Sequence, residues 1–198
     1  MSKNITFRQY RAMDLFFFTA VLCLSEVLIT LGATKWFQAE AYTLSFSCAV
    51  MAIVMVRWGA WAAVPVGIGH VAFCLVYGLS EAVSWQQFLI YVVGSQAGLL
   101  MLLFLKKVNW QKLQQDVLLA LLYGLLTALC MQLGRMGMAL VLGSSLQSGI
   151  GFITTDVLST FICVLLVWIA RRLDGMLEEQ KHYLIRVQEE KEREMQRM

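Results

Sequence analysis

Residues 15–33 read LFFFTAVLCLSEVLITLGA, an apolar run in which Glu26 is the single charged side chain. The hydrocarbon core of a bilayer is about 30 Å thick, and a helix needs roughly 20 residues to cross it. A segment inside lipid must also satisfy its own backbone hydrogen bonds, which only helices and closed barrels achieve. The stretch therefore predicts a transmembrane helix, and similar runs recur as far as residue 170.

Six apolar runs are separated by short polar or charged connectors. They cover residues 15–33, 42–56, 59–79, 85–105, 117–133 and 150–170. The composition agrees, since 59% of the residues are hydrophobic and 15% are charged, whereas a soluble domain carries about a quarter charged residues. The predicted fold class is an all-α polytopic membrane protein with six transmembrane helices.

The positive charges of the connectors alternate from one side of the predicted bundle to the other. One side holds the N-terminal segment and every second connector, with Lys3, Arg8, Arg11, Arg57, Lys106, Lys107, Lys112, Arg171 and Arg172. The connectors of the other side hold only Lys35 and Arg135. Because cytoplasmic connectors carry the excess of lysine and arginine, we expect both termini to be cytoplasmic and the protein to lie in the cell membrane.

The last part of the chain, residues 173–198, is rich in charges of both signs. Opposite charges three or four residues apart stabilise an exposed helix by roughly 0.2–0.5 kcal/mol per pair. We therefore divide the chain into a transmembrane substrate-binding domain, residues 1–172, and a cytoplasmic charged helical tail, residues 173–198. The tail is interpreted either as a solvated continuation of the sixth helix or as a docking surface for a cytoplasmic partner or the membrane face.

Ionisable side chains inside apolar segments cost about 2.5–3.5 kcal/mol at the bilayer centre and therefore indicate function. Glu26, His70 and Asp156 occupy such positions. Other polar and aromatic side chains collect at the outer ends of the first, fourth, fifth and sixth segments. The pattern indicates a pocket that opens outward, and its candidate ligand-binding residues are Glu26, Lys35, Trp85, Tyr91, Ser95, Gln132, Arg135, Thr155 and Asp156.

Several of these residues also have a structural interpretation. Trp85 stands where interfacial aromatic residues commonly anchor a helix. Glu26 and His70 are able to pair with each other inside the bundle, as a polar clasp. Asp156 needs a partner, such as Arg135, Lys35 or a bound molecule, because a lone carboxylate is costly there.

The sequence lacks the signatures of common catalytic and metal sites. It contains no HExxH, GxSxG or phosphate-binding glycine loop, the motifs that mark such chemistry. The five cysteines all fall inside apolar segments and form no CxxC pair, so neither a disulfide framework nor a zinc site is indicated. We expect no enzymatic activity, no cofactor, no bound metal and no binding of nucleic acid.

Residues 51–70, MAIVMVRWGAWAAVPVGIGH, consist of an apolar segment, a short basic turn and a glycine-rich segment. This stretch resembles the second and third helices of the substrate-binding S components of energy-coupling factor (ECF) transporters. In layout, the resemblance extends over roughly residues 10–172. It implies a subunit that captures a vitamin-like nutrient outside the cell and binds a shared transmembrane coupling subunit and two cytoplasmic ATPase subunits.

In that family, small residues of the first helix, often an Ala-x-x-x-Ala pair, contact the coupling subunit. Here Ala20 is followed one turn later by Leu24. Gly59, Ala63 and Gly67 are spaced four residues apart, which allows close approach of helices in lipid. We therefore expect these three residues to form the partner interface instead.

Two other classes of function stay open from the residues alone. One is a non-catalytic membrane scaffold like the rod-shape MreD proteins, in which the tail and the glycine ridges would be the working surfaces. The other is a membrane-embedded enzyme that uses His70 and Glu26 as acid and base.

Overall fold

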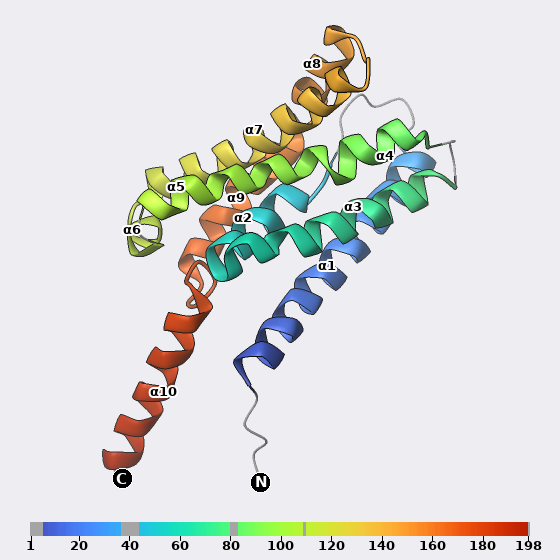
Figure 1. The fold of residues 1–198 in the computed structure, drawn as a ribbon. Coiled ribbons are helices and arrows are strands. Elements are labelled where there is room, and N and C mark those ends of the chain that lie inside the picture. Colours follow the sequence, from blue (N-terminus) through green and yellow to red (C-terminus); the bar gives the residue numbers. More distant parts are fainter. Residues whose placement is uncertain (1–5, 37–43, 80–82, 109, 198) are drawn as a thin grey trace.

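The structure is a computed structural model that describes residues 6–36, 44–79, 83–108 and 110–197. Every regular element within these ranges is helical (Figure 1). In chain order they are α1 (Phe7–Trp36), α2 (Ser47–Trp58), η1 (Gly59–Ala62), α3 (Ala63–Tyr77), α4 (Trp85–Val92), η2 (Gly94–Leu100), α5 (Met101–Lys107), α6 (Trp110–Gln115), α7 (Val117–Val141), α8 (Leu146–Thr155), α9 (Val157–Arg172) and α10 (Gln180–Arg197). The predicted all-α class is confirmed.

Four helical stretches among the described residues are long and apolar enough to cross a membrane. They are Phe7–Ala33, Ser47–Tyr77, Trp85–Lys107 and Val117–Val141. Helices α8 and α9 meet at an angle of 42° and form a fifth candidate if they make one broken span. The protein is thus a membrane protein with four or five candidate spans, and the predicted number of six is not confirmed.

The difference in number arises at α2, which is short and lies inside the bundle. All twelve of its residues are buried, and at 1.5 Å per residue the helix is only about 18 Å long. Gly59, which follows α2, has a φ of 62°, a conformation that glycine adopts without steric cost. The chain reverses there, so α2 and α3 form a hairpin within the stretch Ser47–Tyr77 (Figure 1).

Contacts with α1 confirm this reversal. Asp14 of α1 bonds to Arg57 at the end of α2, whereas Glu26, three turns later, bonds to Ser45 just before α2 begins. Helix α1 is therefore antiparallel to α2. It runs parallel to α3, because Arg11 stacks on Trp61 just before α3 and Leu22, further along α1, packs where a Cβ on Gly69 would lie.

Helix α7 and segment η2 approach each other through glycine. A Cβ on Gly134 of α7 would clash with the backbone oxygen of Gly94, and a Cβ on Gly94 would lie 3.0 Å from the Cα of Arg135. No side chain separates the two backbones at this crossing. The neighbouring side chains of Ser95 and Arg135 are thereby brought within hydrogen-bond distance of each other.

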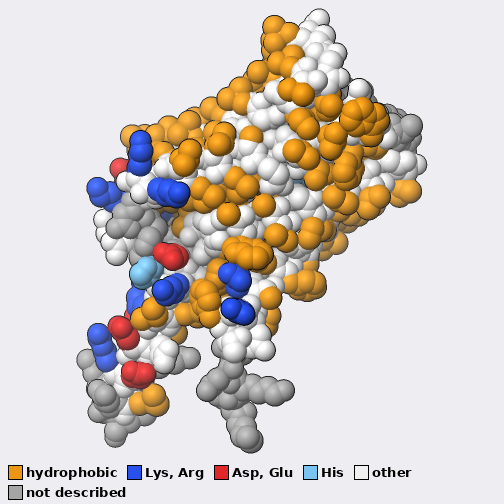
Figure 2. Space-filling view, viewed as in Figure 1, with side chains coloured by type: hydrophobic (Ala, Val, Ile, Leu, Met, Phe, Trp, Pro, Cys, Tyr) orange, Lys and Arg blue, Asp and Glu red, His pale blue; other side chains and the backbone are white. Residues whose placement is uncertain are grey.

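Charged side chains gather at one end of the molecule, where α1 begins and α10 leaves the bundle (Figures 1 and 2). We call this the charged end; its basic residues include Arg11, Arg57, Lys106, Lys107, Lys112, Arg171, Arg172 and Lys181. Hydrophobic side chains cover most of the rest of the face in Figure 2. Such a distribution is typical of a helix bundle whose middle contacts lipid.

The tail is not a continuation of the preceding helix. Helix α9 ends at Arg172, and Gly175, with a φ of 69°, lies in the turn before α10 begins at Gln180. Arg57 holds this turn, because it donates to the Gly175 carbonyl at 2.6 Å and makes two hydrogen bonds to Asp14, at 3.0 and 2.8 Å. The interpretation of the tail as a solvated continuation of the sixth helix is therefore wrong, and α10 extends away from the bundle as a separate helix (Figure 1).

Candidate ligand-binding site

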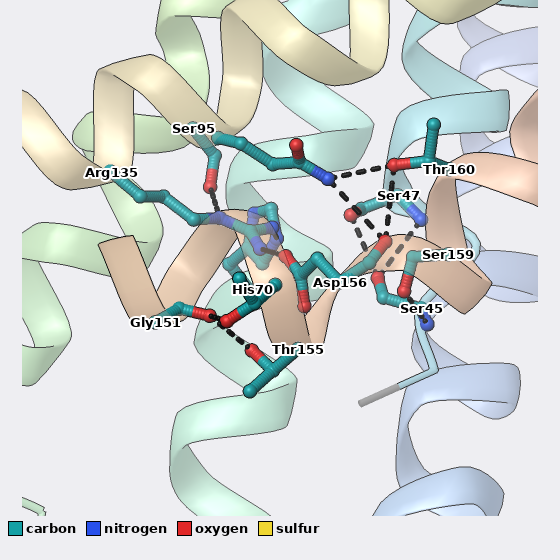
Figure 3. A network of polar contacts seen from close by, with 12 residues as sticks. Ser45, Ser47, His70, Ser95, Arg135, Gly151, Thr155, Asp156, Ser159 and Thr160 are labelled. Atoms are coloured by element: carbon teal, nitrogen blue, oxygen red, sulfur yellow. Dashed lines mark hydrogen bonds and ion pairs between the residues drawn. The ribbon is translucent and has the colours of Figure 1, made fainter. Parts of the chain in front are cut away.

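Arg135 lies at the centre of a buried group of polar side chains that comes from five parts of the fold, α3, α4, η2, α7 and the α8–α9 break. Its Nη1 lies 2.5 Å from Oδ2 of Asp156, its Nε donates to Oγ of Ser95 at 2.7 Å, and its Nη2 lies 3.0 Å from Nε2 of His70. The ring of Tyr91 lies 5.4 Å from the guanidinium carbon. We call these five residues the polar centre; Figure 3 labels Arg135, Asp156, Ser95 and His70.

Burial makes the ion pair of the polar centre energetically significant. The side chains of Arg135 and Asp156 are only 4% and 8% exposed. Removing one partner of a buried pair costs about 3–5 kcal/mol, because the other charge is left without compensation. The pair is thus stable only as a unit, and any molecule that separates its members must replace the interactions that both lose.

Asp156 stands where the last membrane segment breaks. It is the residue between α8 and α9, which meet at 42°. The carboxylate lies at the N-terminal end of α9, where the helix dipole favours a negative charge. Broken helices near the middle of a membrane are a recurrent way to place polar groups against a ligand or ion.

A second polar group adjoins the polar centre and comprises Glu26, Ser45, Ser47 and Ser159. The Ser45 hydroxyl donates to Oε1 of Glu26 at 2.5 Å and lies 2.7 Å from the Ser47 hydroxyl, and the Ser45 backbone N–H donates to Oγ of Ser159 at 3.0 Å. We call it the serine–glutamate group. It joins α1 to the start of α2 and to α9.

Gln132 lies between the two groups. Its Nε2 donates to Oγ1 of Thr160 at 2.7 Å and to the backbone oxygen of Asp156 at 3.4 Å. The first turn of α9 therefore contacts both groups, through Asp156 and through Ser159 (Figure 3). A displacement of this turn would change both groups together.

His70 contributes a buried ring whose proton position follows from its partner. A guanidinium only donates, so Nε2 of His70 accepts from Arg135 and the proton of the neutral ring lies on Nδ1. Nδ1 is buried and faces the backbone oxygen of Val66, one turn earlier, but without the geometry of a full hydrogen bond. A bound molecule with a better-placed acceptor at this point would strengthen its pairing.

The structure brings together most, but not all, of the predicted ligand-binding residues. Tyr91, Ser95, Arg135 and Asp156 belong to the polar centre, while Gln132 and Glu26 are next to it.

Three predicted residues have surroundings outside the polar centre. The Thr155 hydroxyl donates to the Gly151 carbonyl within α8 at 2.8 Å. Lys35 is exposed at the end of α1, and Trp85 is 66% exposed at the start of α4. Trp85 therefore has the surroundings of an interfacial anchor.

Pairing between Glu26 and His70 was predicted wrongly. Glu26 bonds to Ser45, and His70 bonds to Arg135. The serines were not predicted: Ser45 and Ser47 lie near the start of the apolar run 42–56, and Ser159 lies one turn after Asp156. Their position within apolar sequence is the signal that identifies them, since buried hydroxyl groups need partners.

The predicted partner interface is used partly inside the molecule. A Cβ on Gly67 would lie 3.4 Å from Nε2 of Gln96, and the Ala63 carbonyl accepts from the same nitrogen at 3.4 Å. Both residues thus face η2. Gly59 lies at the turn that follows α2, not along the ridge of α3.

Nothing in the described ranges groups three or more histidine, cysteine, aspartate or glutamate side chains as metal ligands. The polar centre instead offers one guanidinium, one carboxylate, one imidazole and one aromatic ring, which suits recognition of a small polar molecule. No family model, curated protein or solved structure matches the chain. Its function must therefore be inferred from the site.

Proposed function

We propose that this protein is the substrate-binding membrane subunit of an uptake transporter for a small, water-soluble, vitamin-like nutrient, of the kind found as the S component of ECF transporters. The observation that supports this most is the Arg135–Asp156 pair, buried between α7 and the α8–α9 break. Ionisable residues within membrane segments commonly mark substrate pathways. The subunit itself catalyses no reaction in this proposal.

In the proposed topology the chain passes the membrane six times, with both termini in the cytoplasm. Helix α2 is one of the six, shortened and enclosed by its neighbours. The support comes from the charged end, where the basic residues of alternate connectors lie together with α10. The polar centre then opens toward the exterior, because the loop between α7 and α8 lies at the opposite end of the bundle (Figure 1).

The buried ion pair also limits the chemistry of the ligand. A molecule that inserts between Arg135 and Asp156 must offer an acceptor or anionic group to the guanidinium and a donor or cationic group to the carboxylate. A ligand with only one of these would leave a buried charge uncompensated, at about 3–5 kcal/mol. We therefore propose an amphoteric ligand, with an aromatic or heterocyclic part that stacks on Tyr91.

Delivery of this ligand requires partners in the proposal. A shared transmembrane coupling subunit and two cytoplasmic ATPase subunits supply the energy. Gly59, at the turn on the charged end, is the member of the predicted interface that is not packed against η2. It is proposed to contact the coupling subunit.

The ligand is tested by extracting the purified protein with denaturant and identifying released small molecules by mass spectrometry. The test variant combines Arg135→Gln with Asp156→Asn, so that no charge is left unpaired. The matched control combines Arg57→Gln with Asp14→Asn, which neutralises another part-buried pair, at the charged end. The proposal predicts a compound near one equivalent in the wild type and the control, and its loss in the test variant.

Partners are tested by affinity purification from native membranes. Recovery of two ATPases and a second membrane subunit supports the transporter. Their absence, together with retention of the compound by the test variant, would refute both the transport role and the site.

A further inference from the structure

A groove of about 1410 Å³ lies at the charged end, and none of the residues of the polar centre lines it. One wall comes from the end of α2 and from η1, and the other from η2 and α5. Much of the wall is apolar, with Met55, Ala60, Trp61, Leu99 and Leu103 among its residues. Such a surface, next to membrane-spanning helices, is suited to hydrocarbon and not to water.

The rim of the groove is strongly basic. Arg11, Lys106, Lys107 and Lys181 contribute to the lining, and none of the four makes an ion pair with a residue that the structure describes. Arg11 stacks on Trp61, with 4.4 Å between its guanidinium carbon and the ring. The rim therefore carries positive charge that the protein itself does not neutralise.

Other charged residues of the lining have partners already. Arg57 is held by Asp14, so it adds little free charge. Glu179, the acidic residue of the lining, lies 3.4 Å from His182. The net character of the rim is thus cationic, directly beside an apolar wall.

We propose that this groove binds an anionic phospholipid. The acyl chains lie against the apolar wall, and the phosphate lies at Lys106, Lys107 and Lys181. Basic pockets between membrane helices bind anionic headgroups in this way, and each basic residue near the surface is worth about a fivefold change in affinity. The proposal does not depend on the transport role, because it does not involve the polar centre. Gly59, which is proposed to contact the coupling subunit, also lines the groove, so a bound subunit would compete with the lipid.

The test is lipid retention, measured by native mass spectrometry of the whole chain after titration with phosphatidylglycerol or phosphatidylcholine. The groove variant replaces Lys106, Lys107 and Lys181 with glutamine; all three side chains are exposed. The matched control replaces Arg8, Lys112 and Arg172 with glutamine, which removes the same charge near the same end from exposed residues outside the groove. Ala60→Trp, at an exposed position, fills the apolar wall and leaves every charge in place.

The wild type is expected to prefer phosphatidylglycerol. Three fivefold steps predict about a 100-fold loss of affinity in the groove variant, while the control triple stays within fivefold of the wild type. Ala60→Trp should lower retention of phosphatidylglycerol as well. Glycerol phosphate and inorganic phosphate, added as competitors, should not displace the lipid, since they lack acyl chains.

Four results would overturn the proposal. Equal losses in the groove and control triples would show general attraction to the surface, and equal binding of both lipids would remove the role of the rim. Displacement by inorganic phosphate at millimolar concentration would indicate a phosphate site instead of a lipid site. Protection of Lys107 from chemical labelling only when partner proteins are bound would assign the groove to a protein.

Discussion

Replacing Asp156 with asparagine provides the sharpest test of how the polar centre is held together. The substitution keeps the shape of the side chain and removes its charge, so that Arg135, buried at 3% exposure, loses its ion-pair partner. Ser95, His70 and the Tyr91 ring still contact the guanidinium, but none of them is an anion. Glu26, in the neighbouring serine–glutamate group, is the carboxylate that remains nearby.

Because these contacts remain, we expect Asp156→Asn to lower the free energy of unfolding by about 3 kcal/mol, the lower end of the range for a broken buried pair. For a chain of this length, about 3 kcal/mol corresponds to a decrease in Tm on the order of 6–12 °C. The assay is thermal unfolding in detergent for the wild type, Asp156→Asn, Arg135→Leu and the double variant. The double variant leaves no charge unpaired. Its loss of unfolding free energy should therefore be about 2–3 kcal/mol smaller than the sum of the losses in Arg135→Leu and Asp156→Asn.

Two outcomes would refute this reasoning. A decrease in Tm below about 2 °C for Asp156→Asn would mean that the guanidinium is hydrated or paired elsewhere. A double variant whose loss equals the sum of the single losses would mean that Arg135 and Asp156 do not interact.

Three further predictions follow from other contacts of the structure. Gly134→Ala places a methyl group against the Gly94 carbonyl and should lower the free energy of unfolding by about 1–3 kcal/mol. Gly137→Ala, on the same helix with nothing within 4 Å of its Cβ, should leave it unchanged. Equal unfolding temperatures of the two variants would contradict the close approach of α7 and η2. Arg57→Gln releases the turn that contains Gly175 and should speed proteolysis between α9 and α10 at least severalfold; unchanged cleavage would show that the turn is held otherwise. Burial raises the pKa of Glu178 above its ordinary value of 4.5, although Arg186 opposes this. The contribution of Glu178 to stability is therefore fully present below about pH 4.5 and declines as the pH rises through its folded-state pKa. The Tm of the wild type, relative to that of Glu178→Gln, should decrease between about pH 4 and 7, and a relative increase would contradict this direction of the pKa shift.

Arg135 illustrates how far hydropathy predicts this fold. The apolar run ends at residue 133, and the sequence analysis therefore placed Arg135 in a connector. In the structure α7 continues to Val141, because Asp156 supplies the charge that Arg135 needs inside the bundle. Hydropathy is assigned to each residue separately, so it cannot show that two charged residues 21 positions apart neutralise each other.

Helix α2 shows a second limit of the pattern. Its apolar composition, SCAVMAIVMVRW, is equally typical of a lipid-facing span and of a core helix covered on all sides. Length alone distinguishes them, and at twelve residues α2 is too short for a full span. The turn expected between the apolar runs 42–56 and 59–79 does lie where the chain reverses, at Gly59.

The break at Asp156 has no local signal that the sequence analysis used. Neither proline nor glycine stands at residues 155–157, although these residues cause most kinks. The break instead accompanies the tertiary contacts of Asp156 and Ser159. Gly175, by contrast, was a usable signal for the turn before α10, since a glycine in the left-handed region commonly follows a helix end.

The side of the membrane to which the polar centre opens is tested most directly by chemical labelling in intact cells. The five native cysteines are first replaced, and single cysteines are then introduced as Tyr91→Cys in the polar centre, Trp85→Cys as the outer control and Lys107→Cys at the charged end. A membrane-impermeant maleimide should label Tyr91→Cys and Trp85→Cys from outside, and Lys107→Cys only after the cells are permeabilised. Labelling of Tyr91→Cys solely after permeabilisation, or of Lys107→Cys in intact cells, would contradict an outward-facing nutrient site.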